Sequence, residues 1–154
     1  MRCHRCWLPS APSWTGCWRR YRNGGGVSWA ELGDNARDSQ AALNRPWFES
    51  ALAPALHRWP EVEAVLANEG ARIADVGCGA GWSTIALARA YPSAAVIGVD
   101  VDAPSIQAAN ANAEVAGVAD RATFRVAQGQ SLSEFGAVRC CLRVRVRSRH
   151  AAPG

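Results

Sequence analysis

The chain has 154 residues, of which 49% are hydrophobic, so it can bury one modest core and forms one domain at most. It lacks both the run of roughly 18 apolar residues that a membrane span needs and the apolar stretch of a secretory signal, which predicts a cytoplasmic protein without a membrane segment. The net charge of +4 is segregated: residues 27–136 hold all thirteen acids and seven arginines, a net −6, and ten arginines without any acid lie in the two ends.

Residues 1–26 show no apolar period of a helix or a strand, and we expect an irregular or disordered tail there. Cys3 and Cys6 form a C-x-x-C pair, which is half of a common zinc site. A second pair at suitable spacing is absent from the sequence, so no metal site is expected.

Residues 27–70 are predicted to be a helical lead-in. Ser28, followed by Glu31 three residues later, has the spacing of a capping box that starts a helix. Pro46 and Pro60 each suit a first helical turn and stop any helix that precedes them. Helices are therefore expected over residues 35–43, 47–57 and 61–67.

From residue 71 onward, short apolar runs alternate with helical stretches, which is typical of an α/β fold with a parallel sheet. The pattern predicts strands over residues 72–76, 95–99 and 122–127. It predicts helices over residues 81–91 and 103–116. Asp102 is a suitable N-cap for the second helix, and Gly117 is a suitable left-handed residue after its end.

A glycine-rich run, Asp75-Val76-Gly77-Cys78-Gly79-Ala80-Gly81, lies where the first strand meets its helix. Glycine there permits unusual backbone angles and lets a ligand approach the backbone closely. A dinucleotide fingerprint G-x-G-x-x-G that starts at Gly77 would end at Trp82. A bulky side chain at that position argues against a dinucleotide ligand.

This run resembles motif I of the class I S-adenosylmethionine-dependent methyltransferases, in which an acid at the strand end precedes G-x-G-x-G. The resemblance implies that Asp75 helps to hold the amino group of the methionine moiety. It also implies that the loop passes beneath the cofactor, S-adenosyl-L-methionine. The loop residues of this predicted site are Gly77, Cys78, Gly79 and Gly81.

The same resemblance assigns residues after the second and third strands to the cofactor site. Asp100 ends the second strand, where the family uses a carboxylate to accept hydrogen bonds from both ribose hydroxyls; Val101 follows it, and Asp102 competes for that role. After the third strand the family usually places an Asp against the adenine amino group. Here Gln128 and Gly129 stand instead, and the Gln128 amide could accept that bond without charge assistance or be only a solvated loop residue.

The resemblance implies a Rossmann-like class I methyltransferase fold that is incomplete, with about three parallel strands, a helical N-terminal lead-in and irregular ends. Residues 71–136 would form a partial cofactor-binding domain, and residues 137–154 a basic irregular tail. In this family the first strand lies between the second and the fourth, so we expect one unpaired edge. Residues 24–48 resemble, less specifically, the connection to the catalytic domain in bacterial methyltransferases that carry an N-terminal winged-helix domain.

The function implied is transfer of the methyl group of S-adenosyl-L-methionine to a small-molecule acceptor, by a fragment that is weakly active or inactive because the acceptor-binding half is missing. No catalytic residue is named, because such enzymes work largely by positioning their reactants. Two alternatives stay open: a nucleic-acid-binding protein acting through its Arg-rich ends, and an NAD-dependent oxidoreductase. A shifted reading frame is a hypothesis that would explain both unusual ends.

Overall fold

A computed structural model describes residues 22–23, 27–129, 131 and 140–142 of the chain. Cys3, Cys6 and most of the two arginine-rich ends lie outside these residues, and so do the predictions made for them. The chain divides into two compact units, residues 1–40 and residues 41–154. Within the part of the chain that the structure describes, every helix is too short or too polar to cross a membrane.

The first unit contains the predicted capping box, which begins helix α2 (Trp29–Leu32). The Glu31 backbone N–H donates to Ser28 Oγ over 3.3 Å, and the Ser28 backbone N–H donates to the Glu31 carboxylate over 3.1 Å. Two backbone donors that a helix start leaves unpaired are thereby satisfied. The predicted helix start is confirmed.

Helix α3 (Asp34–Ser50) begins in the first unit and ends in the second. It continues through Pro46, so the predicted helix break before this residue is wrong. Proline lacks the N–H that would bond to the carbonyl four residues earlier, but Ala42 and Pro46 are both exposed, and water can replace that bond. The break comes instead at Ala51, before α4 (Leu52–Leu56), whereas α5 (Pro60–Leu66) begins at its proline as predicted.

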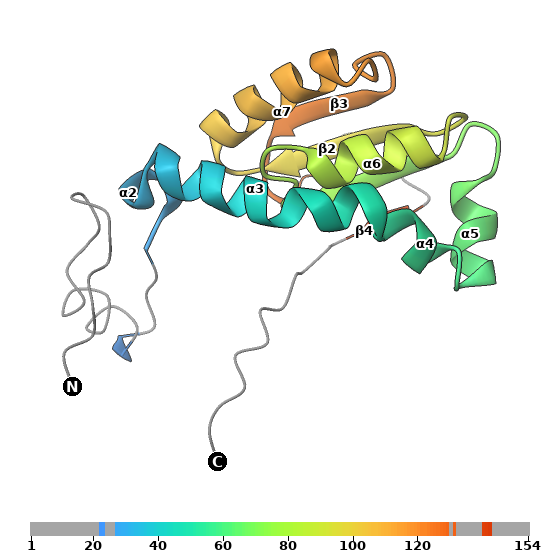
Figure 1. Ribbon diagram of the computed structural model, residues 1–154, viewed down its shortest axis with the longest axis horizontal. Helices are drawn as coiled ribbons and strands as arrows, with labels where there is room; N and C mark the ends of the chain where they lie inside the picture. The colour runs from blue at the N-terminus through green and yellow to red at the C-terminus, as the bar shows by residue number, and fades with distance from the viewer. Residues whose placement is uncertain (1–21, 24–26, 130, 132–139, 143–154) are drawn as a thin grey trace. The chain divides into compact units, whose positions relative to one another are not determined.

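The second unit contains a parallel sheet with the strand order β3-β2-β1-β4. Its strands are β1 (Arg72–Val76), β2 (Ala95–Asp100), β3 (Ala122–Val126) and β4 (Cys140–Leu142). The first three confirm the predicted strands to within one residue at each end. Helix α6 (Trp82–Ala90) joins β1 to β2, and α7 (Ala103–Val115) joins β2 to β3. The connections from β1 to β2 and from β2 to β3 both step toward the same edge of the sheet. Because such connections are right-handed, α6 and α7 lie on the same face of the sheet, where they contact each other (Figure 1).

Strand β4 corrects the expectation of an unpaired edge beside β1. Ile73 pairs with Cys140, and Asp75 pairs with Leu142, in a parallel ladder. The three residues fall in the segment that was predicted to be an irregular tail. They lie between Arg139 and Arg143, and they supply the backbone partners that the buried edge of β1 requires.

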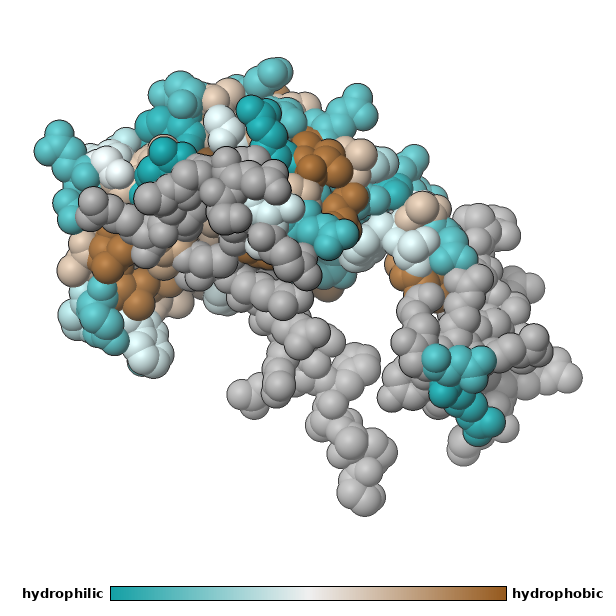
Figure 2. Space-filling model, turned by 180° about the vertical axis from the view of Figure 1, so that it is seen from behind, coloured by the Kyte–Doolittle hydropathy of each residue, from teal (hydrophilic) through white to brown (hydrophobic). Residues whose placement is uncertain are grey.

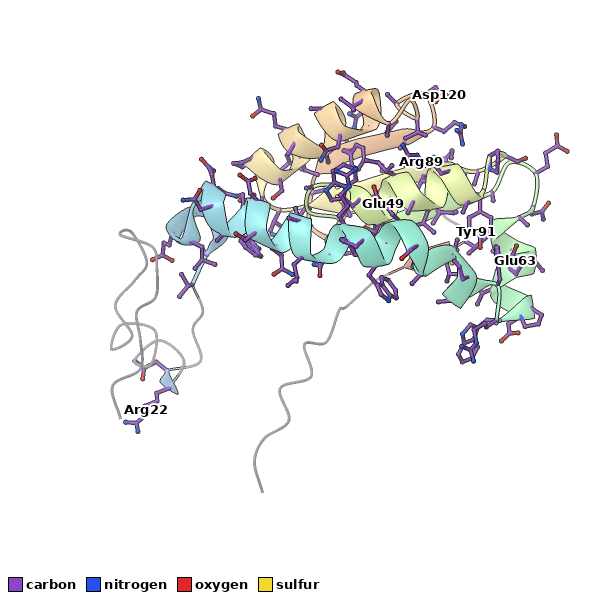
Figure 3. The ribbon with its side chains drawn as sticks, viewed as in Figure 1. Arg22, Glu49, Glu63, Arg89, Tyr91 and Asp120 are labelled. Carbon is purple, nitrogen blue, oxygen red and sulfur yellow. The ribbon has the colours of Figure 1, made fainter. Side chains whose placement is uncertain are left out.

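Helices α4 and α5 pack on the same core as the sheet. Leu52 and Leu66 are buried in one cluster with β-strand and α6 side chains. Tyr91, at the end of α6 and 3% exposed, donates its hydroxyl to the Glu63 carboxylate of α5 over 2.7 Å (Figure 3). Figure 2 shows that one face of the molecule carries several separate hydrophobic patches between hydrophilic residues.

Candidate cofactor-binding site

The loops that follow β1, β2 and β3 meet at the carboxyl edge of the sheet. The Gly79 N–H donates to Asp100 Oδ2 over 2.9 Å, which joins the glycine-rich loop to the end of β2. The Ala127 N–H donates to the Asp100 carbonyl over 2.9 Å, which joins the end of β3 to the same place. Ligands of open α/β sheets bind at this edge, so three separately predicted segments come together where a ligand would lie.

All three glycines of the predicted motif have left-handed backbone angles, with φ of 77° at Gly77, 52° at Gly79 and 83° at Gly81. Side chains other than that of glycine rarely adopt this conformation. A Cβ at Gly77 or Gly79 would meet no atom within 4 Å. The outer part of the loop is therefore open enough for a ligand to lie against its backbone.

Gly81 differs from the other two glycines, because it is buried against the structure behind the loop. A Cβ at this position would lie 2.8 Å from the Ala109 Cβ of α7 and 2.8 Å from the Phe124 ring of β3. The small residue required for close packing is thus Gly81. A dinucleotide fingerprint would place that requirement at position 82, where the side chain of Trp82 lies against Arg45.

Asp75 lies beneath the loop and is 1% exposed. Its Oδ2 accepts hydrogen bonds from Ser83 Oγ over 2.6 Å and from Thr84 Oγ1 over 2.7 Å. Burial raises the pKa of Asp75 above its ordinary value; the two hydroxyls oppose this shift, and the charge of Asp100 adds to it. The carboxyl group therefore ties the end of β1 to the first turn of α6.

The raised pKa of Asp75 predicts a specific pH dependence of stability. Because folding favours the protonated form, this group stabilises the fold fully below its unfolded pKa of roughly 4 and loses that contribution as pH rises through the folded pKa. Asp75→Asn keeps an oxygen for both hydroxyls and removes the titration. Urea unfolding at a series of pH values from roughly 4 upward measures the free energy of unfolding of both proteins. We expect the wild type to lose stability relative to the variant as pH rises; a gain in relative stability would contradict the raised pKa of Asp75.

Asp100 and Asp102 have different roles in the structure. Asp100 accepts one backbone N–H at each oxygen, from Gly79 over 2.9 Å and from Asp102 over 3.0 Å. Asp102 caps α7 through the Ser105 N–H and hydroxyl, as predicted. Asp100 is only half-buried, and carboxylate oxygens can accept further bonds, so it is the acid with capacity for a ligand.

The other predicted residues lie around this acid and loop. Val101, directly after Asp100, is 64% exposed. Gln128 and Gly129 are exposed, and a Cβ on Gly129 would lie 3.0 Å from Val76, so this loop passes close to the end of β1. The role of Gln128 toward adenine stays a prediction.

Cys78 is buried within the loop, 6% exposed. Burial raises the pKa of its thiol strongly, and the charges of Asp75 and Asp100 add to the shift. The thiol therefore stays protonated and is a poor nucleophile. Cys78 acts as a small packing residue, as expected from the sequence.

Sequence reasoning did not identify three polar side chains that hold the site together. Ser83 and Thr84 bind the buried Asp75, and Asn112 of α7 donates to the Ala80 carbonyl over 2.9 Å. Ser83 and Thr84 have a usable signal in the sequence. They are adjacent hydroxyl residues in the first turn of a predicted helix, and they follow a predicted buried acid by eight and nine residues. Asn112 has no comparable local signal because it acts across 32 residues of sequence.

A parallel sheet with a glycine-rich loop after its first strand and a carboxylate after its second defines the class of α/β domains that bind a nucleoside-containing cofactor. Among the described residues, no cluster of His, Cys, Asp and Glu could hold a metal ion. The site as described is thus built from backbone groups and carboxylate oxygens.

The chain matches the family described as "Methyltransferase domain" over residues 73–151, just over half of its length. It belongs to this family. The predicted class I methyltransferase family is confirmed, and S-adenosyl-L-methionine is the cofactor of that family. Neither the oxidoreductase nor the nucleic-acid-binding alternative is favoured by the match.

The chain is similar to the release factor glutamine methyltransferase of Chlorobaculum tepidum, with 34% identity over 101 residues, 66% of this chain and 34% of the relative. It is 35% identical to the protein of the same name from Bradyrhizobium diazoefficiens over 80 residues, 52% of this chain and 26% of the relative. The chain thus spans about a third or less of the length of these relatives. Among solved structures, an RNA methyltransferase from Salinibacter ruber in complex with S-adenosyl-L-homocysteine matches with 31% identity and a TM-score of 0.41, covering 49% of this chain and 47% of that one.

Proposed function

We propose that the chain binds S-adenosyl-L-methionine at the carboxyl edge of its sheet and serves as the cofactor-binding part of a methyltransferase. One observation carries this proposal: the Gly79 backbone is bonded directly to the Asp100 carboxylate. The glycine-rich loop and the acid of β2 therefore form one surface, although they are 21 residues apart in sequence. The open space at Gly77 and Gly79 fits a cofactor that lies along that loop.

Each predicted residue has a proposed task on this surface. The backbone of Gly77 and Gly79 lies under the methionine moiety. Asp100 accepts the ribose hydroxyls with the lone pairs that its two backbone donors leave free. Val101 offers an exposed apolar surface to the adenine ring, and Gln128 offers an amide to its polar edge.

The sequence predicted that Asp75 helps to hold the amino group of the methionine moiety, and we propose a positioning role for it instead. Its carboxyl group is buried and engaged by two hydroxyls, so it acts on the cofactor through the shape of the loop. By fixing the first turn of α6, it sets where the loop ends.

When bound, the cofactor would supply a methyl group on a positively charged sulfur for in-line displacement by the acceptor. What the chain would contribute is orientation: Asp100 would hold the ribose, and the loop would hold the methionine moiety. Holding reactants in this way lowers the entropic part of the barrier. Weak or absent transfer by this chain, and a cytoplasmic location, stay predictions.

The acceptor belongs to this proposal as well. The relatives differ in what their names state, a release factor glutamine in two and RNA in a third. Asp100 and Asp102 lie together at the proposed site, and residues 27–136 carry a net charge of −6. The negative charge of residues 27–136 disfavours a phosphate backbone at this site, and we propose a small-molecule acceptor, as predicted from the sequence.

Calorimetric titration of the full chain with S-adenosyl-L-homocysteine tests the proposal. We expect saturable binding at one site, and no binding of NADH under the same conditions. NADH binding would support a nicotinamide-dependent oxidoreductase instead. Binding of NADH without binding of S-adenosyl-L-homocysteine would overturn the proposal. Failure of a folded chain to bind either ligand would overturn it as well.

A further inference from the structure

A contact between two helices connects α3 to the first residue of the cofactor loop's helix. The guanidinium carbon of Arg45 lies 3.9 Å from the centroid of the Trp82 ring. This distance and position are those of a cation–π interaction. Arg45 Nε also donates to Glu49 Oε1 over 2.8 Å, one turn further along α3, and Glu49 is labelled in Figure 3.

Trp82 follows Gly81 directly and is the first residue of α6. Its side chain is half-buried and packs against the hydrophobic core, so the ring is not free to move away from α6. Arg45 covers the ring from α3 while Glu49 restrains the guanidinium. The contact therefore connects α3 to the end of the glycine-rich loop.

The loop is fixed on its other sides by contacts already described. Gly81 is buried so close to Ala109 and Phe124 that a Cβ would lie 2.8 Å from each, and the Gly79 N–H is hydrogen-bonded to Asp100. The loop thereby lies against α7 and β3 and is bonded to the end of β2. The Trp82 ring is its attachment to α3.

We propose that Arg45 is a positioning residue for the cofactor loop: by stacking on Trp82, it makes the loop conformation, and hence cofactor affinity, depend on α3. This inference rests on the proposed function for its ligand. The claim that Arg45 orders residues 79–84 can be measured without any ligand.

The test uses the full chain and three substitutions. Arg45→Ala removes the cation, Arg45→Lys keeps a cation that can lie over the ring, and Trp82→Leu keeps an apolar side chain without the ring. Arg58→Ala is the matched control, because Arg58 is an exposed arginine of the same unit. Each protein is measured by amide hydrogen exchange without ligand and by calorimetry with S-adenosyl-L-homocysteine.

We expect Arg45→Ala to speed exchange at residues 79–84 and to weaken binding about fivefold, and Arg45→Lys, which keeps the charge but not the planar guanidinium, to restore part of both. Trp82→Leu should have at least as large an effect, because its ring also packs against the core; the double variant should be no worse than Trp82→Leu alone, because Arg45 then has no ring to lie over. Arg58→Ala should match wild type.

Two results would overturn the inference. One is faster exchange in α3 alone, with residues 79–84 unchanged, which would mean that Arg45 only stabilises its own helix. The other is fully additive effects of Arg45→Ala and Trp82→Leu. If wild type binds no S-adenosyl-L-homocysteine, the proposed function fails, and the exchange data still decide whether Arg45 orders the loop.

Discussion

Replacing Gly81 by alanine should destabilise the chain by about 3–4 kcal/mol, the largest loss expected for alanine at any glycine that the structure describes. Two costs act together at this position. The left-handed backbone, with φ of 83°, costs a residue with a Cβ about 1–2 kcal/mol. The new Cβ would also lie 2.8 Å from both the Ala109 Cβ and the Phe124 ring, and neither neighbour has room to move in a packed core. Urea unfolding measures the loss.

Two other glycines separate these costs. Gly117 has a similar angle, φ of 69°, but nothing within 4 Å of its Cβ position. Gly98 lacks the left-handed angle but is crowded by Phe124, Thr84 and Cys78 at 2.7–2.9 Å. Alanine at either position should cost less than alanine at Gly81. Equal losses at Gly81 and Gly117 would mean that the close approach to α7 and β3 has no energetic weight.

Replacing Asp100 by alanine should weaken S-adenosyl-L-homocysteine binding by roughly tenfold to a hundredfold. This range corresponds to the loss of about one hydrogen bond to a charged group, which costs about 1.5–3 kcal/mol, because a factor of ten corresponds to about 1.4 kcal/mol and water can solvate the hydroxyls at this half-exposed position. The substitution removes the proposed ribose acceptor and also releases the backbone N–H groups of Gly79 and Asp102. Calorimetry on wild type and variant gives the ratio of affinities.

Asp102→Asn is the matched control for this effect. It lies two residues away and removes the same charge, but asparagine is an equally good N-cap, so α7 should be retained. Its affinity should stay within about twofold of wild type, because Asp102 is engaged by Ser105. A large loss at Asp102 with none at Asp100 would reverse the assignment of the two acids.

Most of the sheet and its loop could be predicted because their signals are local. The apolar runs of β1, β2 and β3 are bounded by turn residues, and a left-handed loop after a strand requires glycine. The cap at Asp102 is likewise local, since the bonded group lies three residues away. Such features are determined by residues that are close together in the sequence, so they can be predicted without the fold.

The features that could not be predicted depend on contacts with water or with residues far away in the sequence. Whether α3 ends at Pro46 depends on whether water can reach the carbonyl of Ala42. Strand β4 forms because β1 offers a free edge more than 60 residues earlier in the sequence. The contact of Arg45 with Trp82 joins residues of two separate helices and has no local signal in the sequence.

The most direct test of cofactor binding at this site is a titration of the ¹⁵N-labelled full chain with S-adenosyl-L-homocysteine, followed by two-dimensional amide NMR. The glycines serve as reporters spread over the chain. We predict that the amide signals of Gly77, Gly79 and Gly129 shift with saturable dependence on ligand concentration while those of Gly70 and Gly117 stay in place. Unchanged signals from the loop residues at high ligand concentration, or shifts confined to Gly70 and Gly117, would contradict binding at the carboxyl edge of the sheet.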